Sequence, residues 1–200
     1  MKFKKENEII LASKSGVRKE ILEKNDISCE VVHSNVDEDQ VKDSLINEGA
    51  SPMIISKNLA ELKSIKVSRK FQDRVVLGAD SVIDLSGELV SKPKNRDEAL
   101  TILKKLNGKK HQLISSVCIS KNGSMIWNFT DSSNLTMKNL NLDEIKLYLS
   151  KLDDKKLFAY GVYQIEAGGR SLFSAIEGDE DSIMGLPVKK IKEYLKAYGV

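Results

Sequence analysis

The sequence has 200 residues, of which 40% are hydrophobic and 30% are charged, a balance typical of one globular domain or two closely joined lobes. Its formal net charge is +3 with acids and bases interspersed, and without a basic block or interleaved aromatic residues we expect no groove for long nucleic acid. Residues 1–8 are charged and no apolar run approaches the length of a membrane span, so we expect a cytoplasmic protein with no membrane partner.

Strands and helices alternate through the first half of the chain. Runs of apolar and β-branched residues predict strands at 8–12, 28–34 and 75–78. Helical spacing and capping residues predict helices at 17–24, 39–48 and from Ser51 onward, with Ser15 as a cap for the first and Ser51-Pro52 as the start of the third.

The third predicted helix carries a lysine beside its apolar face. Ile55, Leu59 and Leu62 share that face, and the turn of about 100° per residue places Lys63 on its flank. Lys63 can therefore keep its stem against the core while its ammonium reaches into an adjoining cleft.

The second half of the chain completes an α/β pattern. Beyond Asp80, residues 82–85 and 88–90 flank Ser86-Gly87 as a hairpin, and further strands are predicted at 111–120, 124–131 and 133–138. Capping boxes at 95–98 and 141–144 open two helices, a Gly-rich stretch follows, and a terminal helix starts at Leu186-Pro187. These elements predict an α/β fold with a mixed twisted sheet covered by helices, in a single domain over residues 1–200.

The segment 13–18 brings two hydroxyls, a glycine and Arg18 to a predicted helix N-terminus. Such an end binds anions, because free backbone N–H groups point outward where the helix dipole is positive. From these residues alone, an ordinary Ser-Gly turn with a solvated arginine is the favoured alternative. The spacing is not that of a Walker loop.

Asp80 is predicted to lie in or at the end of a buried strand, where an unpaired carboxylate is costly. A metal, a cation or a function is therefore expected nearby, with an outward-turned or hairpin-capping aspartate as the alternative. Lys92 follows across one hairpin and could return to the same end of the sheet, although a solvated loop lysine is the simpler interpretation of its position.

Two further acids stand beside apolar strand residues: Glu38 follows Val36-Asp37 at a helix start, and Glu166 ends the run Tyr163-Gln164-Ile165-Glu166. Carboxylate oxygens suit Mg²⁺ or Mn²⁺. Zinc is disfavoured, because the chain has only two histidines and no Cys/His cluster. Cys29 and Cys118 lie far apart among apolar neighbours and are interpreted as buried free thiols.

Short motifs in order along nearly the whole chain resemble the Maf family. Each motif is weak alone, and the order and separations make the resemblance strong. The matches are residues 11–22 to LASxSPRRxELL, 36–38 to a short acidic motif, 59–64 to LAxxKA, 78–81 with 92–93 to GADT…KP, 106–111 to LxGxxH, and 185–187 to GLP.

The resemblance implies an ITPase-like fold of two lobes around a nucleotide cleft, and hydrolysis of a nucleoside triphosphate between its α and β phosphates. It implies that Asp80 orients or deprotonates water, and that Arg18, Lys63 and Lys92 surround the phosphates. A divalent metal, Mg²⁺ or Mn²⁺, would be held by Glu38 and Asp80. Members of the family are often dimers, so a homodimer is also implied.

Departures from the family pattern bear on the choice of base. Gly16 replaces the usual proline, and Val17 replaces the first arginine of the pair found in the thymidine/uridine branch. The late motif AGAYGIQG corresponds to residues 160–167, so that Glu166 replaces glutamine, and Ser81 replaces threonine.

The residues expected to bind substrate are therefore Ser13, Ser15, Val17, Ser81 and Glu166. An acidic acceptor at position 166 can take hydrogen bonds from a purine edge or attract the positive ring of a methylated guanine. The sequence thus favours a modified purine such as 7-methyl-GTP over dTTP or UTP. The alternative from another class is a nucleotide-binding regulator of cell division without significant turnover, since the family is associated with septum formation.

Overall fold

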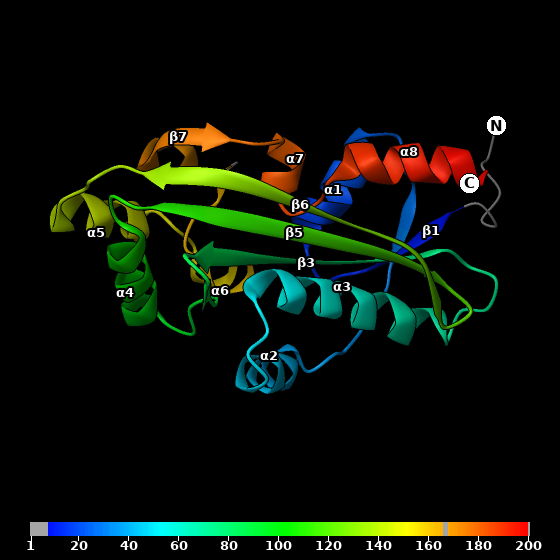
Figure 1. Ribbon diagram of the computed structural model, residues 1–200. Coiled ribbons are helices and arrows are strands. Elements are labelled where there is room, and N and C mark those ends of the chain that lie inside the picture. Colours follow the sequence, from blue (N-terminus) through cyan, green and yellow to red (C-terminus); the bar gives the residue numbers. More distant parts are fainter. Residues whose placement is uncertain (1–7, 166–167, 200) are drawn as a thin grey trace.

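The computed structural model describes residues 8–165 and 168–199, which form helices around one mixed sheet (Figure 1). The strands are β1 (Ile9–Ala12), β2 (Cys29–Val31), β3 (Val76–Leu85), β4 (Glu88–Val90), β5 (Lys110–Lys121), β6 (Ser124–Met137) and β7 (Phe173–Glu177). The helices are α1 (Gly16–Lys24), α2 (Glu38–Asn47), α3 (Pro52–Ser68), α4 (Arg96–Leu106), α5 (Leu142–Ser150), α6 (Asp154–Tyr160), the 3-10 helix η3 (Gly169–Leu172), α7 (Glu180–Ile183) and α8 (Val188–Tyr198).

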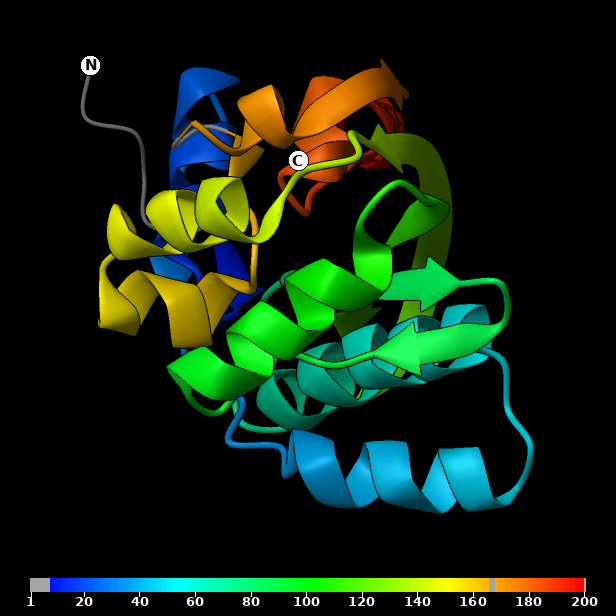
Figure 2. The ribbon, with the colours of Figure 1, turned by 90° about the vertical axis from the view of Figure 1, so that its left-hand side faces the viewer.

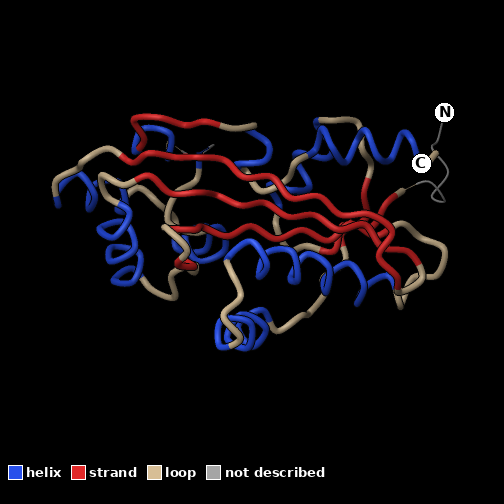
Figure 3. Tube along the Cα trace, in the orientation of Figure 1, coloured by secondary structure: helices blue, strands red, loops and turns tan. Residues whose placement is uncertain are grey.

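The sheet has seven strands in the order β2-β1-β3-β5-β6-β7, with β4 paired to β3 (Figure 3). β1 runs parallel to β2 and β3, while β3, β5, β6 and β7 pair antiparallel. The predicted mixed sheet with flanking helices is confirmed.

Helices cover the sheet on both sides and divide its core. In Figure 1, α3 lies along one face with α2 outside it, and α1 and α8 lie on the other face. Figure 2 shows α4, α5 and α6 gathered at one end of the sheet. One hydrophobic cluster lies at that end and includes Leu103, Leu135 and Leu157, and another joins β1, α1 and α8 through Leu11, Leu22 and Ile191. No helix in the described part of the chain has the length and apolar character needed to cross a membrane.

Most predicted elements are present, and their caps explain why. Ser15 and Ser51 accept the backbone N–H of Arg18 and Ile54 at the starts of α1 and α3, as predicted. Asn141 and Glu144 form the predicted capping box of α5. At α4 the box is incomplete, because the Glu98 carboxylate accepts the N–H of Lys94 instead of that of Asn95.

Three strand predictions were wrong in extent. The strand predicted at 28–34 is only Cys29–Val31. The segments 75–78 and 82–85 are parts of one strand, β3, so Asp80 lies within a strand. The segments 124–131 and 133–138 also join into one strand, β6, because Ser132 and Ser133 keep their pairing to β5.

The face that α3 buries is also offset from the prediction. Leu62 is 41% exposed, whereas Lys63 is 5% exposed and Ser56, Ala60 and Ser64 are fully buried. The small residues let the helix approach β3 closely: a Cβ atom on Gly78 would lie 2.2 Å from the carbonyl oxygen of Ala60. Lys63 is therefore near the centre of the buried face instead of on its flank.

Candidate functional site

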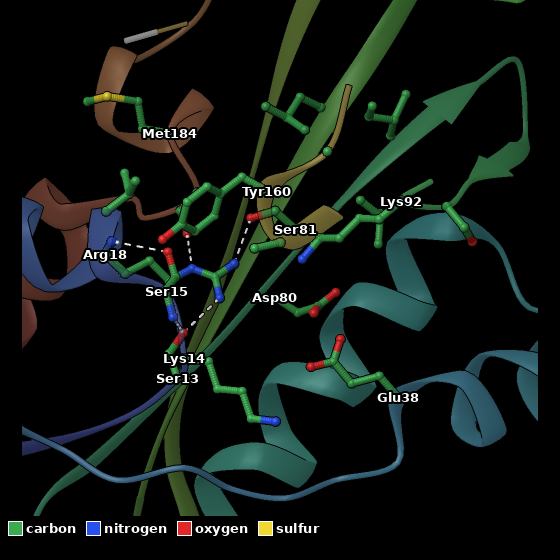
Figure 4. A pocket seen from close by; sticks show the side chains of 18 of the residues that line it. Ser13, Lys14, Ser15, Arg18, Glu38, Asp80, Ser81, Lys92, Tyr160 and Met184 are labelled. Atoms are coloured by element: carbon green, nitrogen blue, oxygen red, sulfur yellow. Dashed lines mark hydrogen bonds between the residues drawn. The ribbon is translucent and has the colours of Figure 1, made fainter. Parts of the chain in front are cut away.

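A pocket of about 300 Å³ lies where the β1–α1 loop, α2, α3 and β3 meet the segments 159–165 and 183–185 (Figure 4). This volume is at the lower end of the range for small-molecule sites. Every described residue that the sequence assigned to the site lines the pocket: Ser13, Ser15, Val17, Arg18, Glu38, Lys63, Asp80, Ser81 and Lys92. Glu166 lies outside the described residues.

One lysine joins two carboxylates at the floor of the pocket. The Nζ atom of Lys63 lies 2.8 Å from Asp80 Oδ1 and 2.8 Å from Glu38 Oε1. Ser56 lies on the same buried face of α3, seven residues before Lys63, and its Oγ donates to the backbone carbonyl of Asp80 at 3.2 Å. The close packing of α3 on β3 thus fixes the ion pair, and α2 delivers Glu38 as its first residue.

Asp80 keeps one oxygen free for a ligand. The residue is 5% exposed, and its Oδ2 atom is buried without a hydrogen-bond partner in residues 8–165 and 168–199. A buried carboxylate oxygen with no donor is unfavourable unless water, a cation or a substrate satisfies it. Because Lys63 holds Oδ1, Oδ2 is the oxygen available for chemistry.

The charge of Glu38 depends on its lysine neighbours. Burial alone would raise the pKa of Glu38, but the Lys63 ammonium, aided by Lys92 and Lys42, outweighs burial and the pKa is lowered. Glu38 also begins α2, where the helix dipole favours a negative charge. Glu38 therefore stays ionised at acidic pH values at which an ordinary glutamate is already protonated.

Arg18 lies at the centre of a hydrogen-bond cluster at the start of α1. Its Nη1 atom donates to Ser13 Oγ at 3.2 Å and to the carbonyl of Ala79 at 3.0 Å, and its Nε atom donates to the carbonyl of Gly185 at 3.0 Å. Most of its N–H donors are thus committed to the protein. Arg18 therefore ties three segments of the pocket wall together. Only part of its guanidinium is left to contact the phosphates, which is the role predicted for it.

The hydroxyl of Ser81 is oriented by a directional chain. The carbonyl of Ser182 can only accept, so Ser115 Oγ donates to it at 2.7 Å. Ser81 Oγ, 2.9 Å from Ser115 Oγ, must then donate to Ser115, and it accepts from Arg18 Nη2 at 3.1 Å. Ser81 therefore offers a ligand a lone pair and no proton.

The pocket carries an excess of positive charge. Among the described lining residues, five cations face two carboxylates: Lys14, Arg18, Lys42, Lys63 and Lys92 against Glu38 and Asp80. Lys92 as a whole residue is exposed to solvent, yet its side chain points into the pocket (Figure 4). Desolvation by the pocket wall, followed by the nearby Arg18 cation, lowers the pKa of Lys92 against the opposing effect of Asp80 and Glu38.

The donor set fits a hard divalent ion. Asp80 and Glu38 present carboxylate oxygens side by side, and the described residues contain no group of three or more His, Cys, Asp or Glu side chains that could hold a metal. Mg²⁺ is commonly held by one or two carboxylates, with water and substrate phosphates completing its shell. The two carboxylates fit such an ion, and they do not fit a closed zinc site.

Several lining residues were not predicted. Lys14 and Lys42 lie beside predicted residues, one within the segment 13–18 and the other four residues after Glu38. Tyr160, the last residue of α6, and Gln164, just beyond that helix, also line the wall, and the Gln164 Nε2 atom is buried with no partner in the part of the chain that the structure describes. A signal for Tyr160 existed, since this residue stands at an alanine of the family motif.

The fold and the pocket define an α/β protein with a positively charged pocket, in which five cations and two carboxylates suit a highly charged anion. The fold is similar to that of the Staphylococcus aureus Ham1 protein, with 14% identity and a TM-score of 0.51, covering 96% of this chain and 99% of that one. The ITPase-like architecture expected from the sequence is thereby confirmed.

The chain belongs to the family described as Maf-like protein, which matches residues 8–198. A nucleoside triphosphate pyrophosphatase of Pelagibacter ubique is 69% identical over 94% of this chain and 97% of its own length. A 7-methyl-GTP pyrophosphatase of Brucella abortus is 36% identical, over 90% of both chains.

Proposed function

We propose that this protein hydrolyses nucleoside triphosphates to the nucleoside monophosphate and pyrophosphate, with Asp80 activating the water. The contact that supports this most directly is Lys63 holding Asp80 by one carboxylate oxygen while leaving the other free. The enzyme class predicted from the sequence is confirmed by the relatives named nucleoside triphosphate pyrophosphatase, 36% and 69% identical to this chain.

The proposed reaction is an in-line displacement at the α-phosphorus. A water oxygen attacks that phosphorus, the bond to the bridging oxygen breaks, and pyrophosphate leaves with the electron pair. Asp80 Oδ2 orients the water and accepts its proton, while Lys63 and Lys92 stabilise the charge that develops on the phosphate oxygens. Arg18 acts mainly by holding Ser13, Ser81 and the backbone of Gly185 in place.

A divalent ion would be held by Glu38 and Asp80. When bound, Mg²⁺ or Mn²⁺ would neutralise phosphate charge and lower the pKa of a bound water. The Lys63 ammonium already brings the two carboxylates together, since it lies 2.8 Å from an oxygen of each. Because this ammonium occupies the space between those two oxygens, the ion would bind through the carboxylate oxygens that Lys63 leaves free, Asp80 Oδ2 among them.

We also propose a preference for a methylated purine such as 7-methyl-GTP. The supporting observations are the Brucella relative that bears this name, at 36% identity, and the glutamate at position 166. The alternative of a regulator without turnover is not favoured, because binding alone has no need for a free buried carboxylate oxygen. A cytoplasmic location and a homodimer stay predictions, the second of which light scattering measures.

The activity is tested by following pyrophosphate release from 7-methyl-GTP, GTP, dTTP and UTP. With Mg²⁺ or Mn²⁺ we expect turnover, and with excess EDTA a loss on the order of a hundredfold or more, because the ion contributes several kcal/mol to the transition state. The Asp80→Asn protein, purified in parallel, is the control for contaminating phosphatases. Absence of turnover with all four substrates would reject the enzyme proposal, and far faster turnover of dTTP and UTP would reject the purine preference.

The pH dependence should identify Lys92. Because the pKa of Lys92 is lowered, its ammonium loses its proton at a lower pH than an ordinary lysine, so kcat/KM should fall on the alkaline side as that charge is lost. Lys92→Arg keeps the charge at all accessible pH values, and the alkaline fall should move upward by about one pH unit or more. Profiles of kcat/KM between pH 6 and 10.5 measure this, and superimposable alkaline limbs for the two proteins would assign the fall to another group.

A further inference from the structure

Tyr160 presents an aromatic ring to the pocket, and this ring has no partner among residues 8–165 and 168–199. It is the last residue of α6, and the chain turns at Gly161, whose φ is +102°. The ring is half-buried, and within the described ranges it stacks on no other ring and its hydroxyl has no hydrogen bond. Figure 4 shows the ring beside the start of α1, across the pocket from Lys92.

The start of α1 leaves room for this ring. The nearest atom to a Cβ built on Gly16 is the Tyr160 hydroxyl oxygen, at 3.5 Å. The family motifs have proline at position 16 and alanine at position 160. Two departures from the family pattern, Gly16 and Tyr160, therefore lie next to each other in the structure. A bulkier residue at position 16 would press on the phenol.

We propose that Tyr160 is the face on which the nucleobase of the substrate stacks, and that it favours a positively charged base such as 7-methylguanine. This inference rests on the proposed pyrophosphatase function. Lys92 lies across the pocket from Tyr160, and Met184 lies on the same side as the ring (Figure 4). Val162 and Ile183 add further apolar side chains to the lining of the pocket. An apolar wall with one free aromatic face suits a planar base, and the negative face of a phenol ring attracts a positive ring more than a neutral one.

Stacking acts on the part of the substrate that does not react. The base remains in the same place in the bound substrate and in the transition state, so loss of the ring should raise KM and leave kcat nearly unchanged. Pyrophosphate, which has no base, should bind equally well with or without the ring.

The experiment compares Tyr160→Leu, Tyr160→Phe and wild type, using KM and kcat for 7-methyl-GTP and GTP and the inhibition constant of pyrophosphate. Tyr160→Leu should raise KM about tenfold for 7-methyl-GTP and less for GTP, with the pyrophosphate constant unchanged. Tyr160→Phe keeps the ring and should restore KM. Tyr198→Leu, at an exposed tyrosine on α8, is the matched control.

Three results would overturn the proposal. An unchanged KM in Tyr160→Leu, or an inhibition constant of pyrophosphate that rises in the same proportion as KM, would show that the base does not stack on Tyr160. An equal rise in KM for GTP and 7-methyl-GTP would show that Tyr160 does not favour a positively charged base. Failure of the wild-type protein to hydrolyse any triphosphate would instead reject the proposed function, which separates the two.

Discussion

Asp80→Asn is expected to lower kcat for nucleoside triphosphate hydrolysis by about a thousandfold while the protein stays folded. A positioned general base contributes roughly 10² to 10⁴ in rate, and an amide cannot accept the water proton. Asparagine has the same shape as aspartate, and Lys63 keeps its contact with Glu38 at 2.8 Å, so the buried ammonium is not left without a partner. Steady-state kinetics and a thermal melt of the same preparation measure both effects.

Asp84→Asn is the matched control for this loss. Asp84 lies four residues further along β3, outside the pocket lining, where its Oδ1 accepts the N–H of Gly87 at 2.6 Å. An amide oxygen can accept the same bond, so we expect wild-type kinetics. Near-normal turnover in Asp80→Asn would mean that another group activates the water. A weaker response to Mg²⁺ titration in Asp80→Asn than in Asp84→Asn would indicate that Asp80 also contacts the ion.

Capping residues in the sequence predicted where helices begin. Ser15, Ser51 and Asn141 each precede a helical pattern, and each caps a helix in the structure. Asp80 could be recognised as unusual because a charge follows a β-branched run, and its partner Lys63 could be placed only as far as the edge of a cleft. The pairing itself depends on how α3 packs on β3, which no local pattern states.

The contacts of Arg18 show what sequence spacing could not provide. Its acceptors include the carbonyls of Ala79, 61 residues away, and Gly185, 167 residues away. Backbone carbonyls have no sequence signature, so a free cation at a helix N-terminus was the simplest expectation. The fold instead uses most of this guanidinium as a link between distant segments.

The region between α5 and α8 was the least predictable part of the chain. It contains α6, η3, β7 and α7, each of seven residues or fewer, too short for helical or strand periodicity to be distinct. Glycines with positive φ at positions 161, 168 and 178 separate these elements and made the segment look irregular. Tyr160 and Gln164 come from this region, which is why the sequence did not assign them to the pocket.

Gly78→Ala is expected to cost at least about 3 kcal/mol of folding free energy and to lower Tm by roughly 10 °C, because the added methyl group has no space. Its Cβ would lie 2.2 Å from the Ala60 carbonyl oxygen and 2.7 Å from the Ser64 nitrogen, both backbone atoms that a side-chain rotation cannot remove. Relief requires α3 to move away from β3. That movement would also lengthen the Lys63–Asp80 contact, so kcat should fall even at temperatures where the protein is folded.

Gly87→Ala separates this crowding from the ordinary effect of losing a glycine. Gly87 lies in the turn between β3 and β4 with a φ of +90° and no atom within 4 Å of a built Cβ, so alanine there meets only conformational strain, about 1 kcal/mol. If the two variants melted at the same temperature, α3 would not be held against β3 as closely as the structure has it. If Gly78→Ala alone lost both stability and turnover, one close helix–strand contact would support the fold and the geometry of the carboxylate together.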